Sequence, residues 1–168
     1  MNPPSIVLFI SFFVALTMSG ILLVIARTYP KTIRGLREWS VAALVIALCF
    51  PLFIARDRIP DLFSIVLANL MLLIALMVMN IGTRKFSGTP PRFGRTLLFL
   101  FVSAHVALFA WFTYVQPDIR VRIATQALFT LVVIVDQLIR VLKALPGTLG
   151  RHVLVFSLAI MIGSRVMR

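Results

Sequence analysis

Apolar and polar positions alternate in long blocks along this chain. Mostly apolar runs are separated by short gaps that hold most of the charged residues. The runs cover residues 5–26, 39–55, 62–81, 96–115, 123–139 and 152–166. Because a helix needs about 20 mostly apolar residues to cross the hydrocarbon of a bilayer, the pattern predicts an all-α, polytopic transmembrane helical bundle of six helices. We expect it to form a single integral membrane domain over residues 1–168.

The basic residues predict an orientation. Successive gaps carry four, two, four, two and three Lys or Arg residues, and two more, Arg165 and Arg168, lie at and just beyond the end of the last run. The positive-inside rule places the richer loops in the cytoplasm. We therefore expect the N-terminus to lie outside the cytoplasm.

Composition agrees with a membrane location. The chain is 61% hydrophobic and only 13% charged, with a net charge of +12. A charge of this size can indicate nucleic-acid binding, but here the basic residues flank apolar runs. Their expected partner is the lipid bilayer and its headgroups, and we expect no nucleic acid.

A weak repeat of about 57 residues runs through the chain. The Pro-Asp pairs at 60–61 and 117–118 are 57 residues apart, and Asn69 and Asn80 align with Gln126 and Gln137. The repeat predicts one leading helix followed by helical hairpins, the last of them incomplete. Asp61 and Asp118 each precede an apolar helix, where a carboxylate can cap free backbone N–H groups.

Asp136 is the acidic residue that falls inside an apolar run, and Arg140 follows it by one helical turn. Intramembrane carboxylates are candidates for function. The i, i+4 spacing places both side chains on one helix face. The pair is either a local ion pair at the inner interface or a relay for a signal or a proton.

His105 lies near the middle of the fourth run, where an imidazole needs a partner. One interpretation is a hydrogen bond to a neighbouring helix, with Asn69 at similar depth. The other is haem ligation, which needs a second histidine. His152 lies roughly 15 Å away along the bilayer normal by helix rise, so we expect no cofactor.

Two further polar groups have open roles. The amides in the apolar runs suit either hydrogen bonds between helices or a pocket for a small polar ligand; they are Asn69, Asn80, Gln126 and Gln137. The second group is a turn of mixed charge, either a solvated loop or an outward-facing ligand reader; it comprises Arg56, Asp57, Arg58 and Asp61.

The sequence contains no catalytic motif that would indicate an enzyme. It lacks a metal-binding His-Glu-x-x-His, a Gly-rich phosphate loop and a nucleophile elbow. Cys49 is alone, which excludes an internal disulfide and a cysteine metal cluster. We expect no catalytic residue and no metal site.

The segment from Tyr29 to Pro91 resembles a known family. It contains Tyr-Pro at 29–30, Gly-Leu-Arg at 35–37 with Trp39, Ile-Pro-Asp at 59–61 and Ser-Ile-Val-Leu-Ala-Asn at 64–69, followed by Gly82, Phe86 and Gly88. These residues are similar to the N-terminal multi-pass membrane region of bacterial GGDEF-type diguanylate cyclases. That resemblance implies a location in a bacterial inner (cytoplasmic) membrane and a sensory or dimerising input in cyclic di-GMP signalling, with catalysis in a cytoplasmic domain behind the last helix.

The chain departs from that family because it contains no GGDEF motif. A cyclase domain, and the seventh helix leading to it, would have to lie beyond residue 168. Two hypotheses follow. The first is a membrane signal-input module, which predicts a homodimer. The sequence does not identify its ligand or stimulus. The second is a small standalone transporter or channel.

Overall fold

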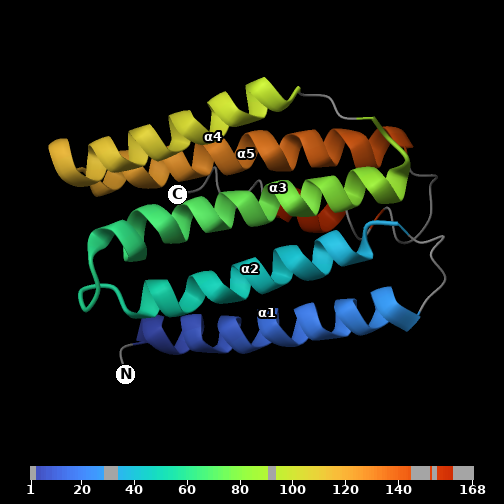
Figure 1. Cartoon of the computed structure of the whole chain (residues 1–168), viewed down its shortest axis with the longest axis horizontal. Coiled ribbons are helices and arrows are strands. Elements are labelled where there is room, and N and C mark those ends of the chain that lie inside the picture. The colour runs from blue at the N-terminus through green and yellow to red at the C-terminus, as the bar shows by residue number, and fades with distance from the viewer. Residues whose placement is uncertain (1–2, 29–33, 91–93, 145–151, 153–154, 161–168) are drawn as a thin grey trace.

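The computed structural model describes residues 3–28, 34–90, 94–144, 152 and 155–160 (Figure 1). These residues fold into helices and connecting turns, with no strand among them. The elements are α1 (Pro3–Thr28), α2 (Leu36–Ile54), the π-helical turn η1 (Leu62–Leu67) leading into α3 (Ala68–Ser87), α4 (Arg95–Ala110) with the π-helical turn η2 (Trp111–Val115), and α5 (Ile119–Ala144). His152 and residues 155–160 are also helical. The predicted all-α class is confirmed.

Four of these helical segments are long and apolar enough to cross a membrane: Ile6–Thr28, Leu36–Ile54, Leu62–Ser87 and Thr96–Val115. They coincide with the first four predicted runs, so the chain is a membrane helical bundle. The count of six spans is not confirmed. α5 is long but is not among the four, and residues 161–166 of the sixth run lie outside the described residues.

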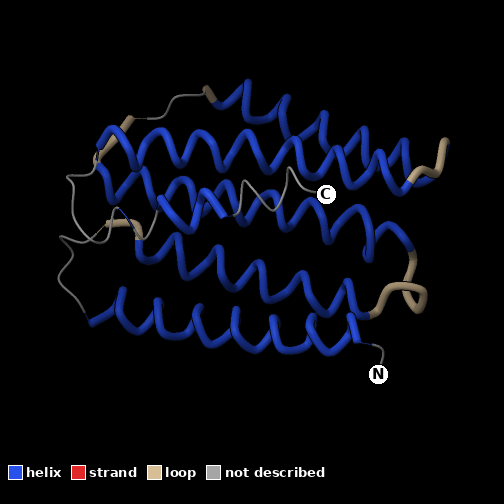
Figure 2. Tube along the Cα trace, turned by 180° about the vertical axis from the view of Figure 1, so that it is seen from behind, coloured by secondary structure: helices blue, strands red, loops and turns tan. Residues whose placement is uncertain are grey.

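The helices lie side by side, with α1, α2, α3, α5 and α4 following one another across the bundle (Figures 1 and 2). Consecutive helices in the chain run in opposite directions. α3 and α5, which are not consecutive, therefore run in the same direction. Their contacts join residues 53–57 positions apart, so the 57-residue repeat predicted from sequence places equivalent positions at the same depth in two parallel helices.

Small residues hold α1, α2 and α3 close together. Ser19 and Ser40 each donate a hydroxyl hydrogen bond to the other's backbone carbonyl, at 3.0 and 2.9 Å. Gly35 adopts a φ of +99°, and a Cβ there would lie 2.2 Å from the carbonyl oxygen of Gly82. Close backbone approach of this kind is typical of helix packing in membranes.

The two predicted aspartate caps have different outcomes. Asp118 Oδ1 accepts hydrogen bonds from the backbone N–H groups of Arg120 and Val121 at 2.8 and 3.2 Å, which confirms the cap of α5. Asp61 makes no side-chain cap hydrogen bond. That prediction was wrong because Asp61 has helical backbone angles and precedes a π-helical turn, in which the Ser64 N–H reaches back to the Pro60 carbonyl.

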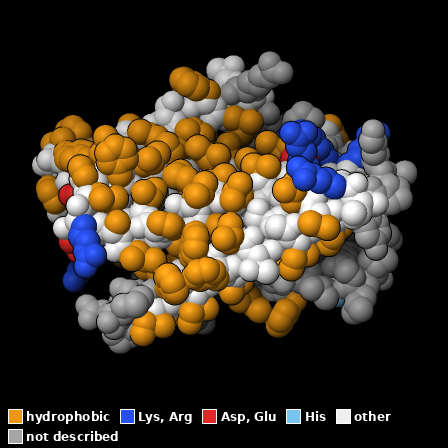
Figure 3. Space-filling view, turned by 60° about the horizontal axis from the view of Figure 1, so that its bottom comes forward, with side chains coloured by type: hydrophobic (Ala, Val, Ile, Leu, Met, Phe, Trp, Pro, Cys, Tyr) orange, Lys and Arg blue, Asp and Glu red, His pale blue; other side chains and the backbone are white. Residues whose placement is uncertain are grey.

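The surface shows the same alternation of apolar and charged zones as the sequence. One face shows hydrophobic side chains across its middle and Lys and Arg side chains near its two ends (Figure 3). Exposed apolar side chains include Phe9, Val14, Phe99 and Leu128, each at least 49% exposed. A water-exposed surface of this kind would be unstable, whereas a bilayer solvates it.

Candidate functional site

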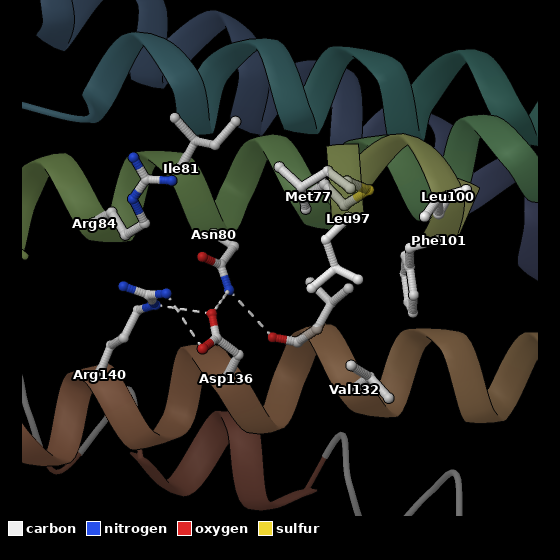
Figure 4. A pocket seen from close by; sticks show the side chains of 12 residues that line it. Met77, Asn80, Ile81, Arg84, Leu97, Leu100, Phe101, Val132, Asp136 and Arg140 are labelled. Atoms are coloured by element: carbon white, nitrogen blue, oxygen red, sulfur yellow. Dashed lines mark hydrogen bonds and ion pairs between the residues drawn. The ribbon is translucent and has the colours of Figure 1, made fainter. Parts of the chain in front are cut away.

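The strongest candidate site lies where α3 and α5 approach the α3–α4 connection. Asn80 Nδ2 of α3 donates to Asp136 Oδ2 of α5 at 3.1 Å and to the Val133 carbonyl at 3.2 Å. Arg140 Nε donates to the same Asp136 oxygen at 2.8 Å, and its Nη2 donates to Asp136 Oδ1 at 3.3 Å. Asp136 and Arg140, which their spacing predicts on one helix face, therefore form an ion pair. Figure 4 shows the Asn80 side chain reaching this pair from α3.

The pair is buried and extends into the connection. Asp136 and Arg140 are 7% and 8% exposed. Arg140 Nη1 donates to the Pro90 carbonyl at 2.9 Å and contacts Thr89 Oγ1 at 3.5 Å. Because both charges are desolvated, each depends on the other's compensation. The network thus links two helices to residues just beyond the end of α3.

A cavity of about 390 Å³ adjoins this network between α3, α4 and α5 (Figure 4). Its charged and polar lining comes from Asn80, Arg84, Asp136 and Arg140. The rest of its wall is apolar; it consists of Met77, Ile81, Leu97, Leu98, Leu100, Phe101, Val132 and Val133. Its size and its few convergent polar groups suit a small-molecule site.

Next to the network, α5 makes one more polar contact with α3. Gln137 Nε2 donates to Thr83 Oγ1 at 2.8 Å, and Thr83 is 1% exposed. Gln137 and Asn80 are the residues that the repeat aligned, and both lie between the same two helices. Both amides thus make hydrogen bonds between helices, and Asn80 also lines the cavity.

A second polar group lies further along α3 and α5 and includes a histidine of α4. His105 of α4 is fully buried, and its Nε2 is 2.8 Å from Gln126 Oε1 of α5. Gln126 Nε2 in turn lies 3.5 Å from the Asn69 backbone carbonyl. The predicted Asn69 partner for His105 was wrong: the Asn69 side chain donates to the Ile65 carbonyl of its own chain segment at 2.7 Å, and Gln126 occupies the position beside the imidazole.

The surroundings of His105 do not resemble a haem site. Its ring contacts those of Phe109 and Phe129 at centroid distances of 4.7 and 5.1 Å. Its Nδ1 is buried with no hydrogen-bond partner among the described residues. His152 is exposed, whereas His105 is enclosed. In the described part of the chain, no group of three His, Cys, Asp or Glu residues could hold a metal ion.

An apolar cluster separates the two polar groups. It comprises Leu73 and Leu76 of α3 with Phe129 and Val133 of α5, each at most 8% exposed. The polar side chains between α3 and α5 therefore do not form one continuous line. They form two groups, one at each side of this cluster.

Of the predicted outer turn, only Arg56 lines a cavity that also contains polar residues of α3 and α5. Arg56, Asp57, Arg58 and Asp61 are all exposed. Arg56 also lines a second cavity of about 350 Å³, together with Asn69, Arg122 and Gln126. Asp57, Arg58 and Asp61 are not in that lining.

Sequence reasoning missed Arg84 and Arg122 as cavity residues. Both were counted only as topology-determining charges in the gaps. Helical spacing held the missing information for Arg84, because Arg84 follows Asn80 by four residues and so shares its helix face. No comparable pattern identified Arg122.

Comparison of the chain with protein-family models, curated proteins and solved structures finds no match. The resemblance to the membrane region of diguanylate cyclases therefore stays a prediction. The class defined by the fold is a membrane-embedded helical bundle with a buried charged network beside a cavity.

Proposed function

We propose that this chain is a membrane-embedded signal-input module of a bacterial inner membrane, and that it acts through an output domain on the same or another polypeptide. The observation that carries the proposal is the buried network of Asn80, Asp136 and Arg140. It joins two parallel helices to the Pro90 carbonyl. Buried charge within a membrane is costly, and ionisable residues there are candidates for function.

The network offers a physical route for a signal. A ligand in the adjoining cavity contacts the same Asp136 and Arg140 side chains that hold α3 and α5. Any shift of Arg140 also changes its hydrogen bonds to Thr89 and Pro90, which follow the last residue of the apolar segment Leu62–Ser87. The change would thus reach residues outside the apolar span. Ligand binding shifts such an equilibrium only through different contacts in the two states.

A transporter is the second candidate, and the two cavities favour it. They lie against different parts of α3 and α5, and each contains arginine. The apolar cluster of Leu73, Leu76, Phe129 and Val133 lies between the polar residues of the two sites. A carrier would have to open this cluster, whereas a signal-input module keeps it closed.

Two measurements distinguish these functions. The coding sequence after Arg168 should continue in frame into a further helix and a soluble enzyme domain, or a separate output protein should co-purify with the chain. Liposomes that contain the 168-residue chain should show no flux of small anions above empty liposomes. Anion flux that Asp136→Asn abolishes would contradict the proposal and support the transporter.

A further inference from the structure

The cavity beside the charged network has two chemically different ends. Asp136, Arg140 and Arg84 lie at one end, together with Asn80 (Figure 4). Leu100 and Phe101 of α4 lie away from these charges in the same view. A ligand that fills the whole cavity therefore needs a polar head and a hydrocarbon body.

The charge of the polar end selects an anion. The described lining contains two guanidinium groups and one carboxylate. Asp136 and Arg140 neutralise each other. Arg84 makes no ion pair among the described residues, and its buried Nε finds no hydrogen-bond partner among them. One cation of the lining is therefore left for a ligand to neutralise.

The apolar end opens toward the lipid. Leu97, Leu100 and Val132 line the cavity and are 51%, 57% and 43% exposed. Leu97 and Leu100 belong to the apolar segment Thr96–Val115, where exposed side chains contact acyl chains. A hydrocarbon chain can thus enter from the side, while its head remains near Arg84 in the last turn of α3.

We propose that this cavity binds one anionic phospholipid, with its phosphate held by Arg84 and an acyl chain between α4 and α5. Arginine suits phosphate because its planar guanidinium offers several N–H donors. Basic pockets between membrane helices are a recurring type of site for anionic headgroups. The inference rests on the proposed function for its consequence, since the lipid would be the ligand that biases the network. Binding itself is measured without any output.

The test uses the full chain, delipidated in a neutral detergent, and native mass spectrometry to count bound lipids. The probes are phosphatidylglycerol and phosphatidylcholine with the same acyl chains, and inorganic phosphate as a third arm. We expect one phosphatidylglycerol to bind about tenfold more tightly than phosphatidylcholine, which corresponds to about 1.4 kcal/mol. Arg84→Gln should remove this preference.

Matched variants separate the site from general effects. Lys85→Gln removes the same charge one residue along, where Lys85 pairs with Glu38 of α2, and it should retain the preference. Leu100→Trp should weaken both lipids by filling the apolar end. Leu44→Trp, on the exposed side of α2, should not. Each variant is compared only after its helix content by circular dichroism matches the parent.

Three results would overturn the inference. Equal binding of the two lipids would remove the anion site. An equal loss of preference in Lys85→Gln and Arg84→Gln would show a general charge effect. Competition by inorganic phosphate at the concentration of the lipid would show a site for a free anion. None of these results bears on the flux and coding-sequence tests, so failure of the lipid site and failure of the proposed function are distinguishable.

Discussion

Asn80 and Asp136, 56 residues apart in the chain, form a hydrogen bond of 3.1 Å between α3 and α5. The same carboxylate oxygen accepts a second hydrogen bond, of 2.8 Å, from Arg140. One atom therefore holds both a contact between helices and an ion pair within α5. Neither helix can slide along the other without breaking the Asn80–Asp136 hydrogen bond.

Removal of one charge should destabilise the bundle strongly. Asp136→Leu leaves the Arg140 guanidinium buried without the Asp136 carboxylate, which should lower the free energy of unfolding by about 3 kcal/mol. Titration of the folded protein from neutral detergent into SDS, followed by circular dichroism, measures this value. The double variant Asp136→Leu/Arg140→Leu is the control, because removing both charges ends the imbalance and should recover most of the loss. A double variant as unstable as the single one would contradict the ion-pair account.

Loss of the amide alone should have a smaller effect. Asn80→Leu removes the two hydrogen bonds that Asn80 donates to α5 but leaves the ion pair, and it should cost about 1 kcal/mol in the same assay. A loss as large as that of Asp136→Leu would mean that Asn80, rather than the ion pair, dominates the network.

Close packing at two glycines should be equally testable. Gly82→Ala places a methyl group 2.5 Å from Trp39 Cδ1, and Gly35→Ala adds the strain of a positive φ. Each should lower the unfolding free energy by about 2 kcal/mol. Gly20→Ala is the matched control, since nothing lies within 4 Å of a Cβ there. If Gly20→Ala lost as much stability, the loss would not come from the approach of α2 to α3.

The orientation predicted from the basic loops can be tested by labelling intact cells with a membrane-impermeant maleimide. Arg58→Cys lies in the exposed turn between α2 and η1, and Gly94→Cys precedes α4 where nothing lies within 4 Å. We expect label on the first variant and label on the second only after the cells are opened. Cys49 is 1% exposed and should stay unlabelled throughout. The reverse pattern would place the N-terminus in the cytoplasm.

Much of the fold could be predicted because the length of an apolar run and the basic residues beside it are local features of the sequence. The first four helical segments coincide with long uncharged runs, and these runs need no tertiary information. The limits of α5 were harder to predict. α5 extends past the predicted range 123–139 and includes Arg120, Arg140 and Lys143. The prediction ended the helix where charged residues begin, whereas the helix continues through turns that contain them.

The candidate site could be predicted only in part. Spacing along one helix predicted that Asp136 and Arg140 share a helix face, and the repeat aligned Asn80 with Gln137 without indicating that Asn80 contacts Asp136. The partner of His105 depended on which helix packs beside α4, which spacing within one segment does not encode. Gln126 was available in the sequence, but only the α4–α5 contact selects it over Asn69. Arg84 was missed because a basic residue at the end of a span is usually explained by topology.

Under the proposed function, the Asp136–Arg140 pair couples the cavity to the residues that follow α3. Hydrogen exchange of peptides that contain Thr89 reports on this coupling, because the Thr89 N–H donates to the Arg84 carbonyl at 3.1 Å and Arg140 contacts Thr89 and Pro90. In lipid nanodiscs, Asp136→Asn should speed exchange of these peptides about tenfold, the equivalent of 1.4 kcal/mol of lost protection. Lys85→Gln should leave exchange unchanged. Equal protection in Asp136→Asn and the parent chain would contradict this coupling.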